Sequence, residues 1–131
     1  MSDKSSILRA FNTHFFDFIN DIIGIFPEKV EIVTARNTFE VAKKANPTII
    51  IKIWHNMIYV PYSSVIEAGD ITFFFEKDYG EDLASFPNSG EILKKIDALR
   101  DPIKCMSDVN RAHSMKYIQN LSKLSDVYSK F

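Results

Sequence analysis

Cysteine is nearly absent from this chain of 131 residues, which holds only Cys105. A single thiol cannot form an internal disulfide, so the chain is not a disulfide-stapled secreted scaffold, and we expect a reducing compartment. Glycine is also scarce. The four glycines never cluster, so the chain has neither a Walker loop nor a dinucleotide-binding loop. A nucleotide enzyme of either class is not expected.

Long apolar runs and a dominant charge are missing as well. No apolar stretch approaches the roughly 18 residues of a membrane-spanning helix, and the first residues lack the pattern of a secretory signal. The chain carries 16 basic and 17 acidic side chains, for a net charge of −1. Net charge therefore draws the chain neither to an anionic membrane nor to nucleic acid. We predict no membrane partner and a location in the cytosol or nucleus.

Catalytic and metal-binding patterns are not found either. The histidines His14, His55 and His113 lie on separate segments, without the paired spacing of zinc ligands. The acidic run 78–82 does not fit a calcium loop, because Leu83 stands where that loop needs glycine. We predict no catalytic residue, no metal and no cofactor, and hence a protein that is not an enzyme.

Aromatic residues are abundant: eleven Phe, five Tyr and one Trp. Over 5–27, apolar residues recur at steps of three and four, which predicts an amphipathic helix that Gly24 and Pro27 bring to an end. The same spacing predicts a second, shorter helix over 34–45. The stripe of the first helix is Leu8, Phe11, Phe15, Phe18, Ile22 and Phe26.

The segment 46–77 has two interpretations. Asn46 followed by Pro47 is typical of a helix start, and Pro61 is a natural stop, so we predict a helix between them. The β-branched residues of 48–54 make a strand the alternative. A short helix closed by Gly69 is expected over 63–68. Over 70–77 we favour a helix, with a strand at 71–75 as the alternative, and 79–90 has the composition of a loop.

The C-terminal part gives the clearest geometry. After a helix over 90–99, Asp101 and Pro102 open a segment without Gly or Pro. One helix over 103–131 would be about 43 Å long, whereas a compact domain of this size is about 36 Å across. Either it packs across its own domain, which we favour, or it presents a heptad seam to a partner. The packing stripe would be Met106, Val109, His113, Tyr117, Leu121 and Tyr128, and the seam Ile103, Met106, Asn110, His113, Tyr117, Asn120, Leu124, Val127 and Phe131.

These elements together predict an all-α fold: residues 1–131 form a single domain, a bundle of five to six helices with a long C-terminal helix. We expect a non-enzymatic protein that binds a protein partner or itself through aromatic and C-terminal residues. The candidate partner-binding residues are Phe73, Phe74, His113, Tyr117, Leu124 and Tyr128.

The alternative function is that of a nucleic-acid-associated accessory factor. Charge is polarised along the chain: 67–82 holds six acids and one lysine, whereas 94–130 holds eight bases and four acids. Basic residues stud the last helix, which could lie along a duplex. The candidate nucleic-acid-binding residues are Lys104, Arg111, Lys116, Lys123 and Lys130.

Four short strings carry a resemblance to a known group. They are FNTHFFDF (11–18), IFP (25–27), FFEKDY (74–79) and YIQNLSKL (117–124). In these the chain resembles small uncharacterised proteins of large nucleocytoplasmic DNA viruses of algae and protists. The resemblance implies a viral assembly or virion component, located at viral replication sites in the host cytoplasm or in the virion. It implies no activity for any residue.

Overall fold

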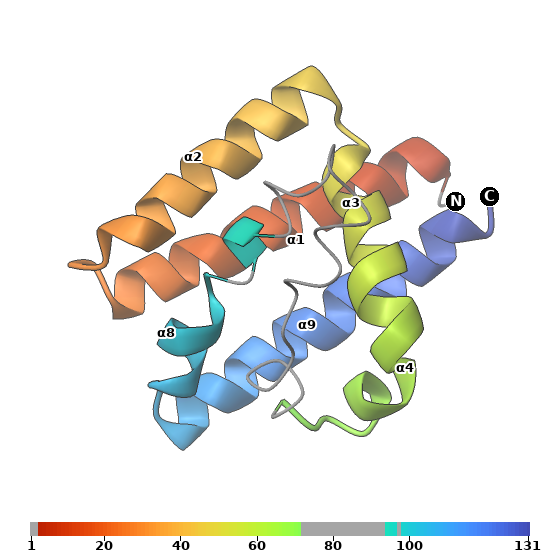
Figure 1. Cartoon of the computed structure of the whole chain (residues 1–131). Coiled ribbons are helices and arrows are strands. Elements are labelled where there is room, and N and C mark those ends of the chain that lie inside the picture. Colours follow the sequence, from red (N-terminus) through yellow and green to blue (C-terminus); the bar gives the residue numbers. More distant parts are fainter. Residues whose placement is uncertain (1–2, 72–93, 97) are drawn as a thin grey trace.

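The computed structural model describes residues 3–71, 94–96 and 98–131, and every structural statement below concerns these residues. Within them the chain is all-α and has no strand, which confirms the predicted fold class (Figure 1). The strand alternative for 48–54 is wrong, and residues 72–75 lie outside the described part. The elements are α1 (Lys4–Ile25), α2 (Val30–Ala45), α3 (Ile49–Ile53), the π-helix η1 (Trp54–Tyr59), α4 (Val60–Glu67), α8 (Arg100–Lys104) and α9 (Asp108–Ser129).

Helix α1 forms where the apolar stripe predicts it. It begins at a proper cap, because the Asp3 carboxylate accepts a hydrogen bond from the Ser6 backbone N–H at 2.8 Å. It ends at Ile25, two residues before Pro27, and the stripe residues Phe11 and Phe15 are fully buried. The apolar face of α1 is therefore packed in the core.

Helix α2 starts four residues earlier than predicted. Ile32 is fully buried together with Ala35 and Phe39, so the buried stripe extends one turn toward the N-terminus. Figure 1 shows α2 on one side of α1 and α9 on the other, with α3, η1 and α4 crossing beside them. Helix α1 is thus the central element.

The core closes around the only tryptophan. Trp54 in η1 is fully buried, and its ring meets those of Phe11 and Phe15 edge-on at 6.3 and 6.2 Å between centroids. Its indole N–H donates to the Ser122 hydroxyl on α9 at 3.1 Å. One side chain thereby connects α1, η1 and α9.

The helical run that starts after Pro47 breaks next to Pro61, as predicted, because Tyr62 has non-helical backbone angles (φ −125°, ψ 22°) and separates it from the short helix expected over 63–68. The Asn46 side-chain oxygen accepts from the Thr48 N–H at 3.1 Å, but α3 begins later than predicted, at Ile49, with Thr48 in its cap position. Pro61 lies in the first turn of α4, where its missing N–H costs little. The helical run is irregular on both sides of Pro61: a π-helix precedes it, and the backbone kinks at Tyr62. Gly69, at φ +78°, closes α4 as predicted.

The expected single helix over 103–131 is wrong. Residues 105–107 separate α8 from α9, and the Ser107 hydroxyl caps α9 by accepting from the Asn110 N–H at 3.3 Å. With 22 residues, α9 is about 33 Å long and does not outrun the domain. It packs across its own domain, as favoured, but its buried face shares only Leu121 and Tyr128 with the predicted stripe. The buried residues of α9 are Ser114, Met115, Ile118, Leu121, Ser122, Ser125 and Tyr128.

Candidate interaction site between α1 and α9

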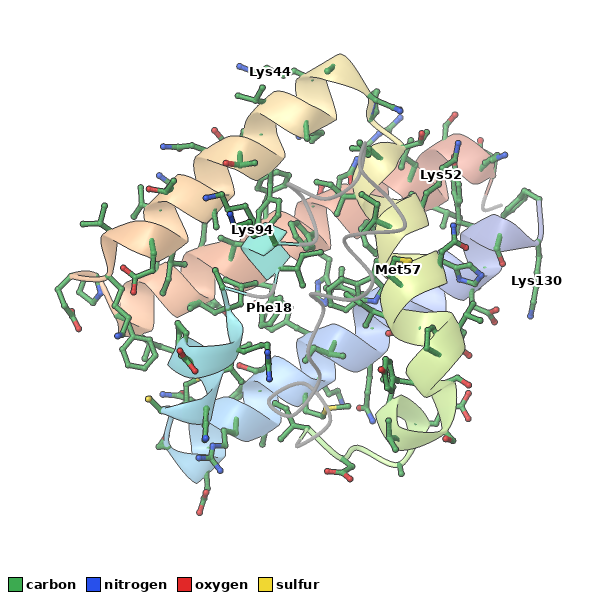
Figure 2. All side chains as sticks on the ribbon, viewed as in Figure 1. Phe18, Lys44, Lys52, Met57, Lys94 and Lys130 are labelled. Carbon is green, nitrogen blue, oxygen red and sulfur yellow. The ribbon has the colours of Figure 1, made fainter. Side chains whose placement is uncertain are left out.

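Tyr117 projects from α9 onto a single row of α1. Its ring stacks against Phe18 at 5.2 Å between centroids, and the His14 ring lies 4.7 Å away. Its hydroxyl donates to a carboxylate oxygen of Asp21 at 2.7 Å. His14, Phe18 and Asp21 follow one another at steps of four and three, so they share one helix face. In Figure 2, Phe18 lies between the ribbons of α1 and α9.

The Tyr117 hydroxyl is held in its neutral form. The hydrogen bond to Asp21, burial, and the negative charges of Asp21 and Asp17 together raise the pKa of Tyr117 to about 12. Each of these effects opposes the phenolate. Tyr117 is therefore a permanent hydrogen-bond donor to Asp21 at neutral pH.

A pocket of about 320 Å³ lies beside Tyr117, between the C-terminal half of α1 and the N-terminal half of α9. We name it the α1–α9 pocket. Its apolar lining comes from Phe18, Ile22, Ile25 and Met106, and its polar lining from Asp21, Asn110, His113, Ser114 and Tyr117. Its volume is at the lower end of the range for small-molecule sites, so it suits one large side chain or a comparable group.

The electrostatics of this pocket favour a cation. Asp21 lies near the C-terminal end of α1, where the helix dipole is negative, and the last turn holds no basic residue. Asp17, one turn earlier, is also exposed. Neither carboxylate forms a salt bridge within the described part of the chain. At this end of α1 the Lys29 ammonium lies over the Phe26 ring, 5.8 Å from its centroid, and no described cation lies within salt-bridge distance of Asp17 or Asp21.

The predicted partner-binding residues do not lie together in the structure. His113, which is exposed, and Tyr117 line the same pocket. Leu124 is half-buried against the core. Tyr128 is only 9% exposed and lies under the Lys4 ammonium, 5.0 Å from its ring centroid, so it offers no free ring. Phe73 and Phe74 lie outside the described residues.

The predicted basic residues also differ from one another. Lys104, Lys116 and Lys123 are exposed. The guanidinium of Arg111 donates to the Lys104 carbonyl, and so it fastens the end of α8 to α9. Lys130 forms an exposed salt bridge with Asp126 at 3.2 Å. Three lysines, at 116, 123 and 130, repeat every seven residues and share one outer row of α9.

Sequence reasoning missed Asp21. It lies on what the pattern presents as the solvated side of the first helix, next to the apolar stripe. The available signal was the pair Asp17 and Asp21 without a nearby base, in the last turns of a predicted helix.

No group of three or more His, Cys, Asp or Glu side chains among the described residues lies close enough to hold a metal ion. None of the described helices has both the length and the apolar character needed to cross a bilayer. No protein-family model, curated protein or solved structure matches the chain.

Proposed function

We propose that this protein is a non-enzymatic helical component of viral assembly or of the virion, acting in the host cytoplasm, and that it binds a protein partner through the α1–α9 pocket. The observation that supports partner binding is the pocket itself, which places the Asp21 carboxylate beside an apolar lining at a helix end without a base. The viral context rests on the resemblance of the four strings.

The partner would contribute a lysine or arginine side chain. Such a side chain has an apolar stem and a cationic head, so the stem would pack on Ile22 and Met106 while the head meets Asp21. A hydrogen bond to a charged group contributes about 1.5–3 kcal/mol, which is roughly a tenfold to hundredfold change in affinity. Anchors of this kind dominate many protein interfaces.

Small probes test the pocket before the partner is known. Butylguanidinium, butyrate and 1-butanol share one chain and differ only in the head group. In NMR titrations of the labelled protein we expect butylguanidinium to shift the signals of Tyr117 and Asn110 the most. Asp21→Asn should weaken this binding, whereas Glu40→Gln, which removes an exposed acid from the outer side of α2, should not. Equal shifts with butyrate would contradict the proposed chemistry.

The partner itself is then tested as a purified protein. Capture from host-cell lysate followed by mass spectrometry supplies candidates, and sedimentation velocity reports self-association. Each purified candidate is titrated against the wild type, Asp21→Asn and Glu40→Gln. We expect Asp21→Asn to bind at least about tenfold more weakly. A protein that stays monomeric and binds no purified candidate would refute the proposal.

The alternative function, nucleic-acid association, is supported by the row of Lys116, Lys123 and Lys130. If this row follows a phosphate backbone, affinity for a duplex must fall steeply with rising salt, and Lys123→Gln must lower the salt slope by about one. Lys130 is partly neutralised by Asp126, and Arg111 is engaged with Lys104. These contacts reduce the charge available to phosphates, so we rank this function second.

A further inference from the structure

A second hollow, of about 280 Å³, lies where the two ends of the described chain meet (Figure 1). We name it the terminal hollow. It is bounded by the first turn of α1, the junction of α3 with η1, and the last turn of α9. Figure 2 shows Lys52 beside the first turn of α1, on the same side of the molecule as both chain ends. The residues that matter below are Lys4, Lys52, His55, Asn56, Tyr128 and Phe131.

The charged side chains that line this hollow are both lysines. Lys4 and Lys52 line it, and no Asp or Glu does. Lys4 is held in place because its ammonium lies 5.0 Å above the Tyr128 ring centroid. Neither lysine lies within salt-bridge distance of a carboxylate in the described residues. Two ammonium groups therefore line a concave surface that holds no side-chain carboxylate.

The acids nearest in sequence are engaged elsewhere. The Asp3 carboxylate caps α1, and its hydrogen bonds with Ser6 lower the pKa of Asp3. Asp126 bridges to Lys130. Both carboxylates make these contacts, and neither lies within salt-bridge distance of Lys4 or Lys52.

The remaining polar groups also favour an oxyanion. The Ser125 hydroxyl donates to the Ser122 carbonyl at 2.8 Å, and its oxygen lies 3.4 Å from His55 Nδ1. The Ser129 hydroxyl donates to the Asp126 carbonyl at 2.7 Å. The donors left for a ligand are the two ammonium groups and the exposed Asn56 amide.

An aromatic ring stands at the rim of the hollow. Phe131 is 57% exposed and lines it, and a half-exposed ring offers a face on which a planar group can stack. The hollow therefore combines two cations with an apolar plate. A phosphate monoester, with close to two negative charges at neutral pH, matches two ammonium groups better than a carboxylate does.

We infer that the terminal hollow binds a small phosphate monoester that carries a planar group, with the phosphate held between Lys4 and Lys52 and the planar group against Phe131. A mononucleotide has this chemistry and this size. The inference is binding only, with no bond made or broken. It is independent of the proposed function, since it uses none of the residues of the α1–α9 pocket.

Calorimetric titration at low ionic strength tests the chemical class. AMP is the probe, adenosine lacks its phosphate, and inorganic phosphate lacks its base. We expect saturable binding of AMP, with both truncated probes at least about tenfold weaker. Short-chain phosphatidic acid carries a phosphate monoester without a planar group, so weaker binding than AMP is expected, and tighter binding would contradict the stacked planar group. Adenosine binding as tightly as AMP would overturn the inference.

Variants test the placement. Lys52→Gln and Lys4→Gln should each weaken AMP by about tenfold, and Lys52→Arg should retain most of the affinity. Lys43→Gln is the matched control, because Lys43 also sits over a ring, that of Phe16 at 5.1 Å, but outside the hollow. The lysines are exposed, so circular dichroism should report an unchanged fold. No saturation by AMP up to about 10 mM, or equal losses with Lys43→Gln and Lys52→Gln, would refute the site.

Discussion

Replacing Ser122 with alanine should destabilise the protein out of proportion to the size of the change. The indole N–H of Trp54 is fully buried, and its hydrogen bond goes to the Ser122 hydroxyl, which is itself only 1% exposed. Ser122→Ala removes the acceptor and leaves a buried donor without a partner. Such a group costs about 1–3 kcal/mol.

The neighbouring Ser125 supplies the matched control. Its hydroxyl donates to the Ser122 carbonyl and lies 3.4 Å from Nδ1 of His55, which is only half-buried. Ser125→Ala therefore leaves no fully buried donor unpaired. Alanine is also the better helix former by a few tenths of a kcal/mol, and this gain is common to both variants. The difference between them should be about 1–2 kcal/mol, with Ser122→Ala the less stable.

Urea unfolding measures this difference. The chain has one tryptophan, so the fluorescence of Trp54 reports on the site itself, while far-ultraviolet circular dichroism reports on the helices. A double-mutant cycle with Trp54→Phe isolates the bond, because phenylalanine has no N–H to satisfy. In that background Ser122→Ala should cost little. If Ser122→Ala costs the same in both backgrounds, or no more than Ser125→Ala, the packing of η1 on α9 described above is incorrect.

Two further predictions concern α1, α9 and α4. Tyr117→Phe should lower the unfolding free energy by about 1 kcal/mol, through loss of the bond to Asp21. The pKa of Tyr117 is about 12 in the folded state and about 10 in the unfolded state, so the unfolding free energy of the wild type should fall as the pH rises from 10 to 12. This fall should be smaller in Tyr117→Phe. Identical pH profiles for the two proteins would argue against the bond. Gly69→Ala should destabilise the protein by about 1–2 kcal/mol, because φ at this position is +78°. Gly24→Ala should stabilise it by about 0.5–1 kcal/mol, because Gly24 lies inside α1 and a Cβ there would meet open space. Thermal melts that show the reverse order would contradict the turn geometry.

The sequence predicted helices best where the buried residues are apolar. The stripe of α1 is built from Phe and Ile, so periodicity identified both the helix and its buried face. The buried face of α9 instead includes Ser114, Ser122 and Ser125. Hydroxyls count as polar in any pattern, and their partners, such as the Trp54 N–H, lie far away in sequence. Periodicity therefore identified Leu121 and Tyr128 as buried but missed the serines of the same face.

Helix boundaries were predicted only in part. The break near Pro61 was predicted correctly, since the backbone leaves the helical region at Tyr62. The break before α9 depends on the Ser107 cap, a weak signal inside a segment without Gly or Pro.

The candidate site was predictable only in part. His113 and Tyr117 were identified from the C-terminal helix alone, and both line the α1–α9 pocket. Asp21 comes from a helix that is distant in sequence, and its role depends on how α1 and α9 cross. No pattern within a single segment holds that information.

Photo-crosslinking from the rim of the α1–α9 pocket tests the central claim most directly. With p-benzoylphenylalanine in place of Asn110, which lines the pocket, the captured partner peptide should contain a lysine or arginine beside the crosslinked residue. The same label in place of Glu40 on α2 should give no such product, and adding Asp21→Asn should reduce the yield from position 110. A crosslinked segment without a basic residue, or a yield that Asp21→Asn leaves unchanged, would contradict the account.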